Sequence, residues 1–230
     1  MMSRTVRVKI CGLTNLADAL QATEAGADYL GFIFYPPSKR ATTPAVVRQI
    51  VAELRQRPNC PTLVGVFVNE AGSTVADLLE ECGLDLAQLH GEEVPSLIND
   101  PRSILYGRSY KGLRPQSVAE AEIEAEWFMA EAPQVRPTLL IDAYHPHLYG
   151  GTGDLSDWEI GRRLAEVTDG LMLAGGLTAA NVQQAVRDVR PFAVDVASGV
   201  EASPGRKDHT AVREFIAAAK EVVLDDAADA

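Results

Sequence analysis

The chain has 230 residues, of which 47% are hydrophobic and 23% are charged, and its formal net charge is −11. This is ordinary globular composition with no apolar run near the ~20 residues that span a bilayer, so we expect one domain over residues 1–224 and a short acidic tail at 225–230. The acidic balance argues against nucleic acid and an anionic membrane as partners, because both attract clustered Lys and Arg, although a small anionic substrate stays compatible with it.

Short apolar runs alternate with helical patterns along the whole chain. Strands are expected, in chain order, at residues 6–11, 29–34, 63–68, 86–89, 105–112, 138–142, 171–174 and 192–196. Helices are expected at residues 16–25, 44–57, 74–82, 94–100, 116–129, 157–167, 178–189 and 209–223. Thr43 before Pro44 is a strong helix start, and Gly83 is a strong stop. The strand at 105–112 has the weakest signal, since it carries Arg108 and Lys111.

Eight strand–helix units predict an α/β protein with a single closed (β/α)8 barrel of the TIM type. An open, doubly wound sheet remains the alternative, because periodicity alone does not separate the two. In a barrel the chemistry lies where strands end and βα loops begin. Those ends are rich in polar residues and glycine, and they comprise Cys11, Gly12, residues 35–40, Asn69, residues 90–92, Lys111, Gly112, Asp142, Gly175, Gly176, Ser198 and Gly199.

The alternation of the first and last strands predicts a buried ion pair. Val8 and Ile10 must face the helices, which turns Lys9 and Cys11 into the barrel. The same alternation turns Asp195 inward on the eighth strand. Because the first and eighth strands are neighbours in a closed barrel, we expect Lys9 to pair with Asp195, either as a structural pair or as part of the site.

Two glycine-containing loops suit a phosphate group. Gly175 and Gly176 follow the seventh strand, and Ser198 and Gly199 follow the eighth. Glycine lets the backbone approach a ligand closely, and many barrels hold phosphate at these two loops. Either loop alone is also explained by glycine as a turn residue, but their paired placement favours a phosphate site.

Histidine and cysteine give weaker indications. The loop at residues 143–153 is long and ends in glycines, which suits a lid, and its His145 and His147 lack an evident third metal ligand. His90 is either a substrate contact or a hydrogen-bonded structural residue. The remaining cysteines, Cys60 and Cys82, are interpreted as buried apolar groups, and without a disulfide framework a reducing cytoplasm is the simplest location. No metal or cofactor is expected.

The chain resembles the phosphoribosylanthranilate isomerase family of tryptophan biosynthesis, which has the TIM-barrel fold. The motifs that carry the resemblance extend over nearly the whole chain, at residues 8–14 (VKICGLT), 26–28 (GAD), 31–32 (GF), 37–40 (PSKR), 64–69 (VGVFVN), 88–92 (QLHGE), 150–153 (GGTG), 157–158 (DW), 174–177 (AGGL), 195–201 (DVASGVE) and 207–208 (KD). One departure is Ala143-Tyr144 after Asp142, where the family often has threonine directly after the aspartate.

The resemblance implies an Amadori rearrangement of N-(5-phosphoribosyl)anthranilate to the aminoketose phosphate, by two proton transfers. It implies Asp142 as the acid, which needs a pKa above the ordinary ~3.9, and Cys11 as the base, for which positive charge from Lys9 would favour the thiolate. Arg40 is the candidate for the anthranilate carboxylate. His90 and Asp195 are further candidates for substrate contact, as are the phosphate-loop residues Gly175, Gly176, Ser198 and Gly199.

Other functions remain open from the residues alone. One is another sugar-phosphate barrel enzyme, such as an epimerase or the indole-forming synthase of the same pathway, although the catalytic lysine and paired glutamates expected of that synthase are missing. A second is a metal-dependent hydrolase that uses His90, His145 and His147. A third is a phosphate-binding module without catalysis, which would need neither Cys11 nor Asp142. We expect a monomer, because no apolar stripe is left after the barrel helices are assigned.

Overall fold

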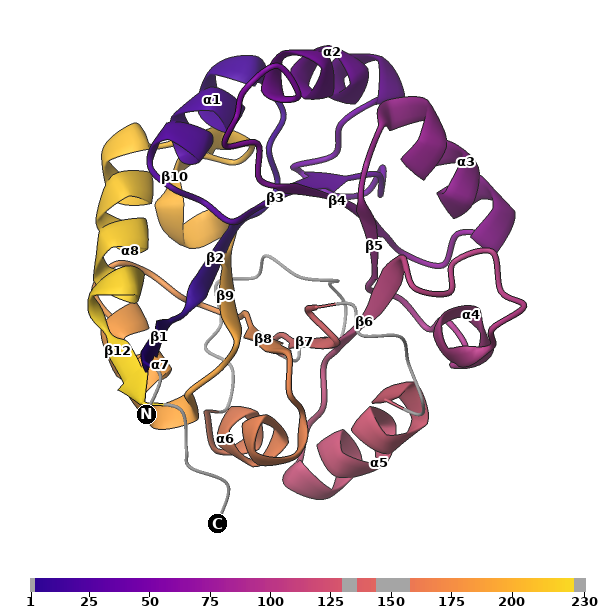
Figure 1. The fold of residues 1–230 in the computed structure, drawn as a ribbon, viewed down its shortest axis with the longest axis vertical. Coiled ribbons are helices and arrows are strands. Elements are labelled where there is room, and N and C mark those ends of the chain that lie inside the picture. Colours follow the sequence, from indigo (N-terminus) through magenta and orange to yellow (C-terminus); the bar gives the residue numbers. More distant parts are fainter. Residues whose placement is uncertain (1–2, 130–135, 144–157, 226–230) are drawn as a thin grey trace.

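A computed structural model describes residues 3–129, 136–143 and 158–225. Eight parallel strands form a closed barrel at its centre, and the last of them pairs with the first (Figure 1). The barrel strands are β2 (Arg7–Ile10), β3 (Tyr29–Ile33), β4 (Thr62–Phe67), β5 (Leu86–Leu89), β6 (Ser109–Leu113), β7 (Leu139–Ile141), β8 (Leu171–Leu173) and β9 (Ala193–Val196). The predicted (β/α)8 barrel is confirmed, and the open-sheet alternative is wrong.

A ring of helices surrounds the barrel (Figure 1). These are α1 (Leu16–Glu24), α2 (Pro44–Leu54), α3 (Gly72–Cys82), α4 (Ser96–Asn99), α5 (Val118–Met129), α6 (Trp158–Val167), α7 (Val182–Val189) and α8 (His209–Glu221). The start of α2 is as predicted, because the Thr43 side chain accepts a hydrogen bond from the Val46 amide and Pro44 occupies the first turn. Gly83 ends α3 in the left-handed conformation with φ 67°. None of the helices in the described ranges is long and apolar enough to cross a membrane.

Several element boundaries differ from the predicted ones. Strand β6 begins at Ser109, because the preceding residues form a turn around buried Leu105. Helix α7 begins only at Val182, since the Thr178 amide donates to the Asn181 side chain in a turn. Helix α8 ends at Glu221, and the next residues form β12 (Val223–Asp225), which pairs antiparallel with β1 (Ser3–Thr5). The sequence also did not predict the hairpin of β10 (Glu201–Ser203) and β11 (Arg206–Lys207), which follows the 3-10 turn η1 (Ser198–Val200).

Two apolar layers hold the barrel in shape. The outer layer packs the strands against the helices and includes Val8 and Ile10 from β2, as their alternation predicts. The inner layer fills the barrel interior with Tyr29, Val64, Leu86, Tyr110, Leu140, Met172, Ala174 and Ala193. Each large side chain buried in this way contributes roughly 1.5–3 kcal/mol. The interior is therefore a packed core, and side chains at the carboxyl ends of the strands rest on it.

The predicted Lys9–Asp195 ion pair lies at the seam that closes the barrel. The two residues are direct partners in the β2–β9 ladder, and Lys9 Nζ is 3.2 Å from Asp195 Oδ1. Both side chains are buried. Burial alone would lower the pKa of Lys9, but the Asp195 carboxylate more than offsets this and the pKa lies above its ordinary value. Lys9 is thus an ammonium group enclosed in the barrel.

Candidate active site

The structure gathers all nine predicted site residues at the carboxyl ends of the barrel strands. Cys11, Arg40 and His90 line one hollow, together with side chains from β3, β4 and β5. Gly175, Gly176, Ser198 and Gly199 line a neighbouring hollow at the loops after β8 and β9. Asp142 and Asp195 belong to both, so they lie where the two hollows meet. One elongated ligand that reaches into both hollows fits this arrangement.

Cys11 lies directly after β2 and its thiol is buried. Its amide donates to the Val196 carbonyl at 2.9 Å, which continues the ladder to β9 and fixes the residue at the barrel mouth. Burial raises the pKa of the thiol, and the positive charges of Lys9 and Lys207 act in the opposite direction. The positive charge of Lys9 therefore lowers the pKa of the thiol, as expected, but by less than burial raises it. The Asp195 carboxylate offsets part of the lowering by Lys9. The raised pKa therefore favours the protonated thiol.

Asp142 follows β7 and faces His90. The Ala143 amide donates to Asp142 Oδ1 at 2.8 Å, and His90 Nε2 is 3.5 Å from Asp142 Oδ2. Both side chains are at most one-tenth exposed. A carboxyl group that accepts a hydrogen bond from one amide, lies near an imidazole and lines a hollow is placed to exchange a proton with a ligand there.

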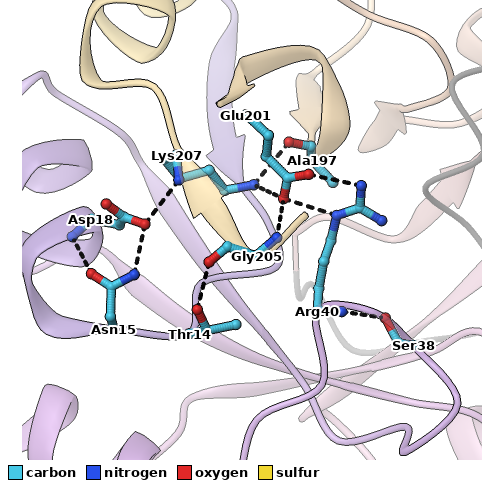
Figure 2. A network of polar contacts seen from close by, with 9 residues as sticks. All are labelled: Thr14, Asn15, Asp18, Ser38, Arg40, Ala197, Glu201, Gly205 and Lys207. Atoms are coloured by element: carbon cyan, nitrogen blue, oxygen red, sulfur yellow. Dashed lines mark hydrogen bonds and ion pairs between the residues drawn. The ribbon is translucent and has the colours of Figure 1, made fainter. Parts of the chain in front are cut away.

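Arg40 is a buried residue of the site wall. Its Nε and Nη2 donate to the two carboxylate oxygens of Glu201 at 2.9 and 2.8 Å, and Ser38 Oγ accepts from its backbone amide (Figure 2). Arg40 is not a surface arginine, because only 9% of the residue is exposed. Glu201 occupies one side of the guanidinium fork, which leaves Nη1 as the group with both N–H bonds available to a ligand.

Glu201 is itself held from a second side. Lys207 Nζ donates to Glu201 Oε1 at 3.0 Å and to the Ala197 carbonyl at 2.8 Å (Figure 2). Burial alone would raise the pKa of Glu201, but Arg40 and Lys207 together hold it below its ordinary value. The Lys207 amide in turn donates to Asp18 on α1. The hairpin after β9 thus ties Arg40, in the loop after β3, to the start of α1 (Figure 2).

The glycine loops form the floor of the neighbouring hollow. Gly175 and Gly176 have φ values of 89° and 60°, a conformation that other residues rarely adopt. A Cβ atom on Gly199 would lie 1.9 Å from the Leu177 carbonyl oxygen, so the two loops touch with no room for a side chain. Backbone groups rather than side chains therefore surround the space, as in sites that bind anions through N–H groups.

Three residues of the site region were not singled out from the sequence, namely Gln88, Glu201 and Lys207. Gln88 lies two residues before His90, so strand alternation places both side chains on the inner face, and this signal would have found it. Glu201 and Lys207 stand within motifs that carry the family resemblance. Their roles depend on the hairpin, which the sequence did not predict.

Metal binding finds no support in the described part of the chain, where no group of three or more His, Cys, Asp and Glu side chains gathers. His145 and His147, which suggested a metal site, lie outside the described residues. A further hollow at the opposite end of the barrel is lined by arginines such as Arg4 and Arg136. It lies away from the strand ends where barrel enzymes carry their chemistry.

Comparisons with known proteins agree with this geometry. The family model of N-(5'phosphoribosyl)anthranilate (PRA) isomerase matches residues 8–218. The N-(5'-phosphoribosyl)anthranilate isomerase of Trichlorobacter lovleyi is 44% identical over 218 residues, which cover 95% of this chain and 100% of the relative. A structure of monomers generated from the dimeric isomerase of Thermotoga maritima has a TM-score of 0.79 at 40% identity, and it covers 94% of this chain and 100% of that chain.

A second solved structure shows such an isomerase with a ligand. It is a phosphoribosyl anthranilate isomerase in complex with reduced 1-(o-carboxyphenylamino)-1-deoxyribulose 5-phosphate, with a TM-score of 0.78 at 39% identity over 94% of this chain and 100% of that chain. The match of the family model and the identity of the relatives extend over nearly the full length. The chain belongs to the N-(5'-phosphoribosyl)anthranilate isomerase family of tryptophan biosynthesis.

Proposed function

We propose that this isomerase rearranges N-(5-phosphoribosyl)anthranilate to 1-(2-carboxyphenylamino)-1-deoxyribulose 5-phosphate, with Asp142 as the general acid and Cys11 as the general base. The observation that carries this proposal is that the two side chains line one hollow, which adjoins a second hollow floored by glycine loops. The reaction needs only proton transfers, and the two groups supply one donor and one acceptor.

The rearrangement begins with ring opening. Asp142 gives its proton to the ribose ring oxygen, the bond from that oxygen to C1 breaks, and the nitrogen lone pair forms the Schiff base. The Cys11 thiolate then removes the proton from C2, and the electron pair moves to form the enolamine. A proton reaches C1 and another leaves the O2 hydroxyl, which gives the ketone. Two protons are taken up, at the ring oxygen and at C1, and two are released, from C2 and from the O2 hydroxyl, so the product is an isomer of the substrate.

The two charged ends of the substrate have different partners. Arg40 Nη1 receives the anthranilate carboxylate, because Glu201 occupies the other side of the guanidinium. The phosphate lies on the loops of Gly175, Gly176, Ser198 and Gly199. His90 and Asp195 border the sugar between them. A solved relative is in complex with a ligand that carries the same two groups, a carboxyphenyl group and a 5-phosphate.

We expect Glu201→Gln to raise KM by about tenfold with a much smaller change in kcat. The glutamine side chain lacks the negative charge that holds the Arg40 guanidinium in place. Hydrogen bonds to charged groups contribute about 1.5–3 kcal/mol. Steady-state kinetics of this variant checks the prediction. Arg40→Ala, measured in the same way, should raise KM by the same order or more. Glu92→Gln is the matched control, since Glu92 pairs with Arg114 while largely exposed. An unchanged KM in Glu201→Gln and Arg40→Ala would place the carboxylate elsewhere.

We expect Gly199→Ala to raise KM by about tenfold or more, because the new methyl group meets the Leu177 carbonyl and must push the loops apart. Inhibition by inorganic phosphate, measured alongside, should weaken by a similar factor. Gly72→Ala is the control, since its methyl group meets only the end of the flexible Leu97 side chain. Normal phosphate inhibition in Gly199→Ala would argue against this phosphate site.

The activity itself is tested with the purified protein and synthetic N-(5-phosphoribosyl)anthranilate. Loss of substrate fluorescence over time is expected, at a rate that is unaffected by a metal chelator. A rate that falls with chelator would support the metal-dependent alternative, and no loss of fluorescence would contradict the proposal. Product identity by mass spectrometry and NMR excludes simple hydrolysis, since hydrolysis releases anthranilate.

We further propose a single domain over residues 1–224, a cytoplasmic location and a monomeric state. The monomer prediction assumed that no apolar stripe remains, but Ile123 and Trp127 lie one turn apart on α5 and are 50% and 58% exposed. A Thermotoga maritima relative is dimeric. Light scattering of the purified protein measures the mass, and a value twice that of the chain would contradict the monomer.

A further inference from the structure

The side chain of His90 is enclosed between two polar partners. Its Nδ1 is 2.9 Å from Gln88 Nε2, whereas its buried Nε2 has no hydrogen-bond partner among the described residues and lies 3.5 Å from Asp142 Oδ2. Only 4% of the residue is exposed. A neutral imidazole carries one proton, so one nitrogen donates and the other accepts. The position of that proton decides whether the ring gives a hydrogen bond to Asp142 or takes a proton from it.

Lys9 determines the orientation of the Gln88 amide. Lys9 Nζ is 2.7 Å from Gln88 Oε1, and the Tyr110 hydroxyl donates to the same oxygen at 3.0 Å. An ammonium group has donors only, so the amide atom that faces it must be the carbonyl oxygen. Burial raises the pKa of Tyr110, and its hydroxyl therefore stays protonated as a second donor. The NH2 group of Gln88 is left to face His90.

An amide NH2 group donates and does not accept, so His90 Nδ1 must present its lone pair to Gln88 and the ring proton must lie on Nε2. We propose that Lys9, acting through Gln88, holds His90 as the Nε2–H tautomer, so that the ring donates toward Asp142 and cannot accept its proton. Gln88 is in this sense a positioning residue of the site.

This inference rests on the proposed role of Asp142 as the acid. In the other tautomer, a lone pair on Nε2 would face Asp142 Oδ2, and an imidazole nitrogen is a much stronger base than a sugar ring oxygen. The acid would lose its proton to the protein rather than to the substrate. The close contact at Gly112 on β6 supports a fixed ring, because a Cβ atom there would lie 2.5 Å from His90 Nδ1.

The tautomer is read directly from the 15N shifts of the histidine ring nitrogens in the full-length protein, with the His90 signals assigned by their loss in His90→Asn. We expect Nε2 to be protonated and Nδ1 not. In Gln88→Glu the new carboxylate only accepts, and a proton should appear at Nδ1. Tyr110→Phe is the control: it removes one donor but keeps Lys9, so the wild-type pattern should persist. A proton at Nδ1 in the wild type overturns the proposal even if no variant folds.

Kinetics then tests the consequence for the reaction. We expect kcat of Gln88→Glu to fall by on the order of tenfold or more, with KM changed less than about threefold, and Tyr110→Phe to stay within about threefold of the wild type. A normal kcat together with a proton at Nδ1 would show that the tautomer does not matter for proton transfer. A wild type without turnover would instead contradict the proposed function, while the ring shifts still decide the tautomer.

Discussion

Asp142→Asn is expected to lower kcat by about 100-fold or more, with little change in KM. The amide has the size of the carboxyl group and keeps the hydrogen bond from the Ala143 amide to its oxygen. It has no acidic proton, however, so the ribose ring must open without a donor. Because the shape of the site is unchanged, substrate binding should be affected much less than turnover.

A matched control variant makes this result specific to the acid. Asp85→Asn is the same chemical change at the opposite end of the barrel, where Asp85 accepts from the Leu63 amide and pairs with Arg55. Its kcat should equal that of the wild type. If Asp142→Asn retained more than about one-tenth of the wild-type kcat while correctly folded, Asp142 would not be the acid.

Cys11→Ser is expected to cause a loss of similar size, about 100-fold or more in kcat, because a serine hydroxyl is far harder to ionise than a thiol. Cys82→Ser is the control, since Cys82 is a buried thiol on α3 outside the site. That variant should keep its kcat. Near-normal turnover in Cys11→Ser would assign the abstraction of the C2 proton to another group.

The pH dependence gives an independent check on Cys11. Burial raises the pKa of the thiol despite Lys9 and Lys207, so the thiol form predominates at neutral pH in the free enzyme. The base must be deprotonated while the acid Asp142 must hold its proton, so the two dependences oppose each other in the wild type. In Asp142→Asn the acid no longer titrates, and the residual kcat/KM of this variant should therefore rise as the pH increases above neutrality. The double variant Asp142→Asn/Cys11→Ser should lose this rise. A profile of Asp142→Asn that stays flat over the same interval would contradict a thiolate base with a raised pKa.

Much of the site was predictable because it depends on the ends of strands. Eight apolar runs identify the barrel, and the carboxyl ends of its strands must meet at one face. That rule alone brings Cys11 and Asp142 into one hollow although they are far apart in the chain. The Lys9–Asp195 pair was predictable for a similar reason. The alternation of side chains along each strand turns both residues into the barrel, and closure of the barrel makes their two strands neighbours.

The remaining features depend on side-chain partners that alternation does not determine. Arg40 was expected to be open to a carboxylate, but Glu201 takes part of its guanidinium, and that residue is positioned by a short polar hairpin. The relay from Lys9 to His90 depends on the direction of a single amide, which is set by hydrogen bonds within the barrel. The pKa of Cys11 likewise follows from a balance of burial against charge that only the assembled barrel defines.

The seam between β2 and β9 has a consequence for how the protein is made. Arg7 pairs with Ala193, which is 186 positions later in the chain. At roughly 5–20 residues per second, a ribosome needs on the order of 10–40 s to deliver the partner of the first barrel strand. Until β9 is synthesised, the edge of β2 that faces it has no ladder partner, so Lys9 lacks Asp195 and the Cys11 amide lacks the Val196 carbonyl. Cys11 is therefore among the first residues synthesised and among the last to be fixed in place.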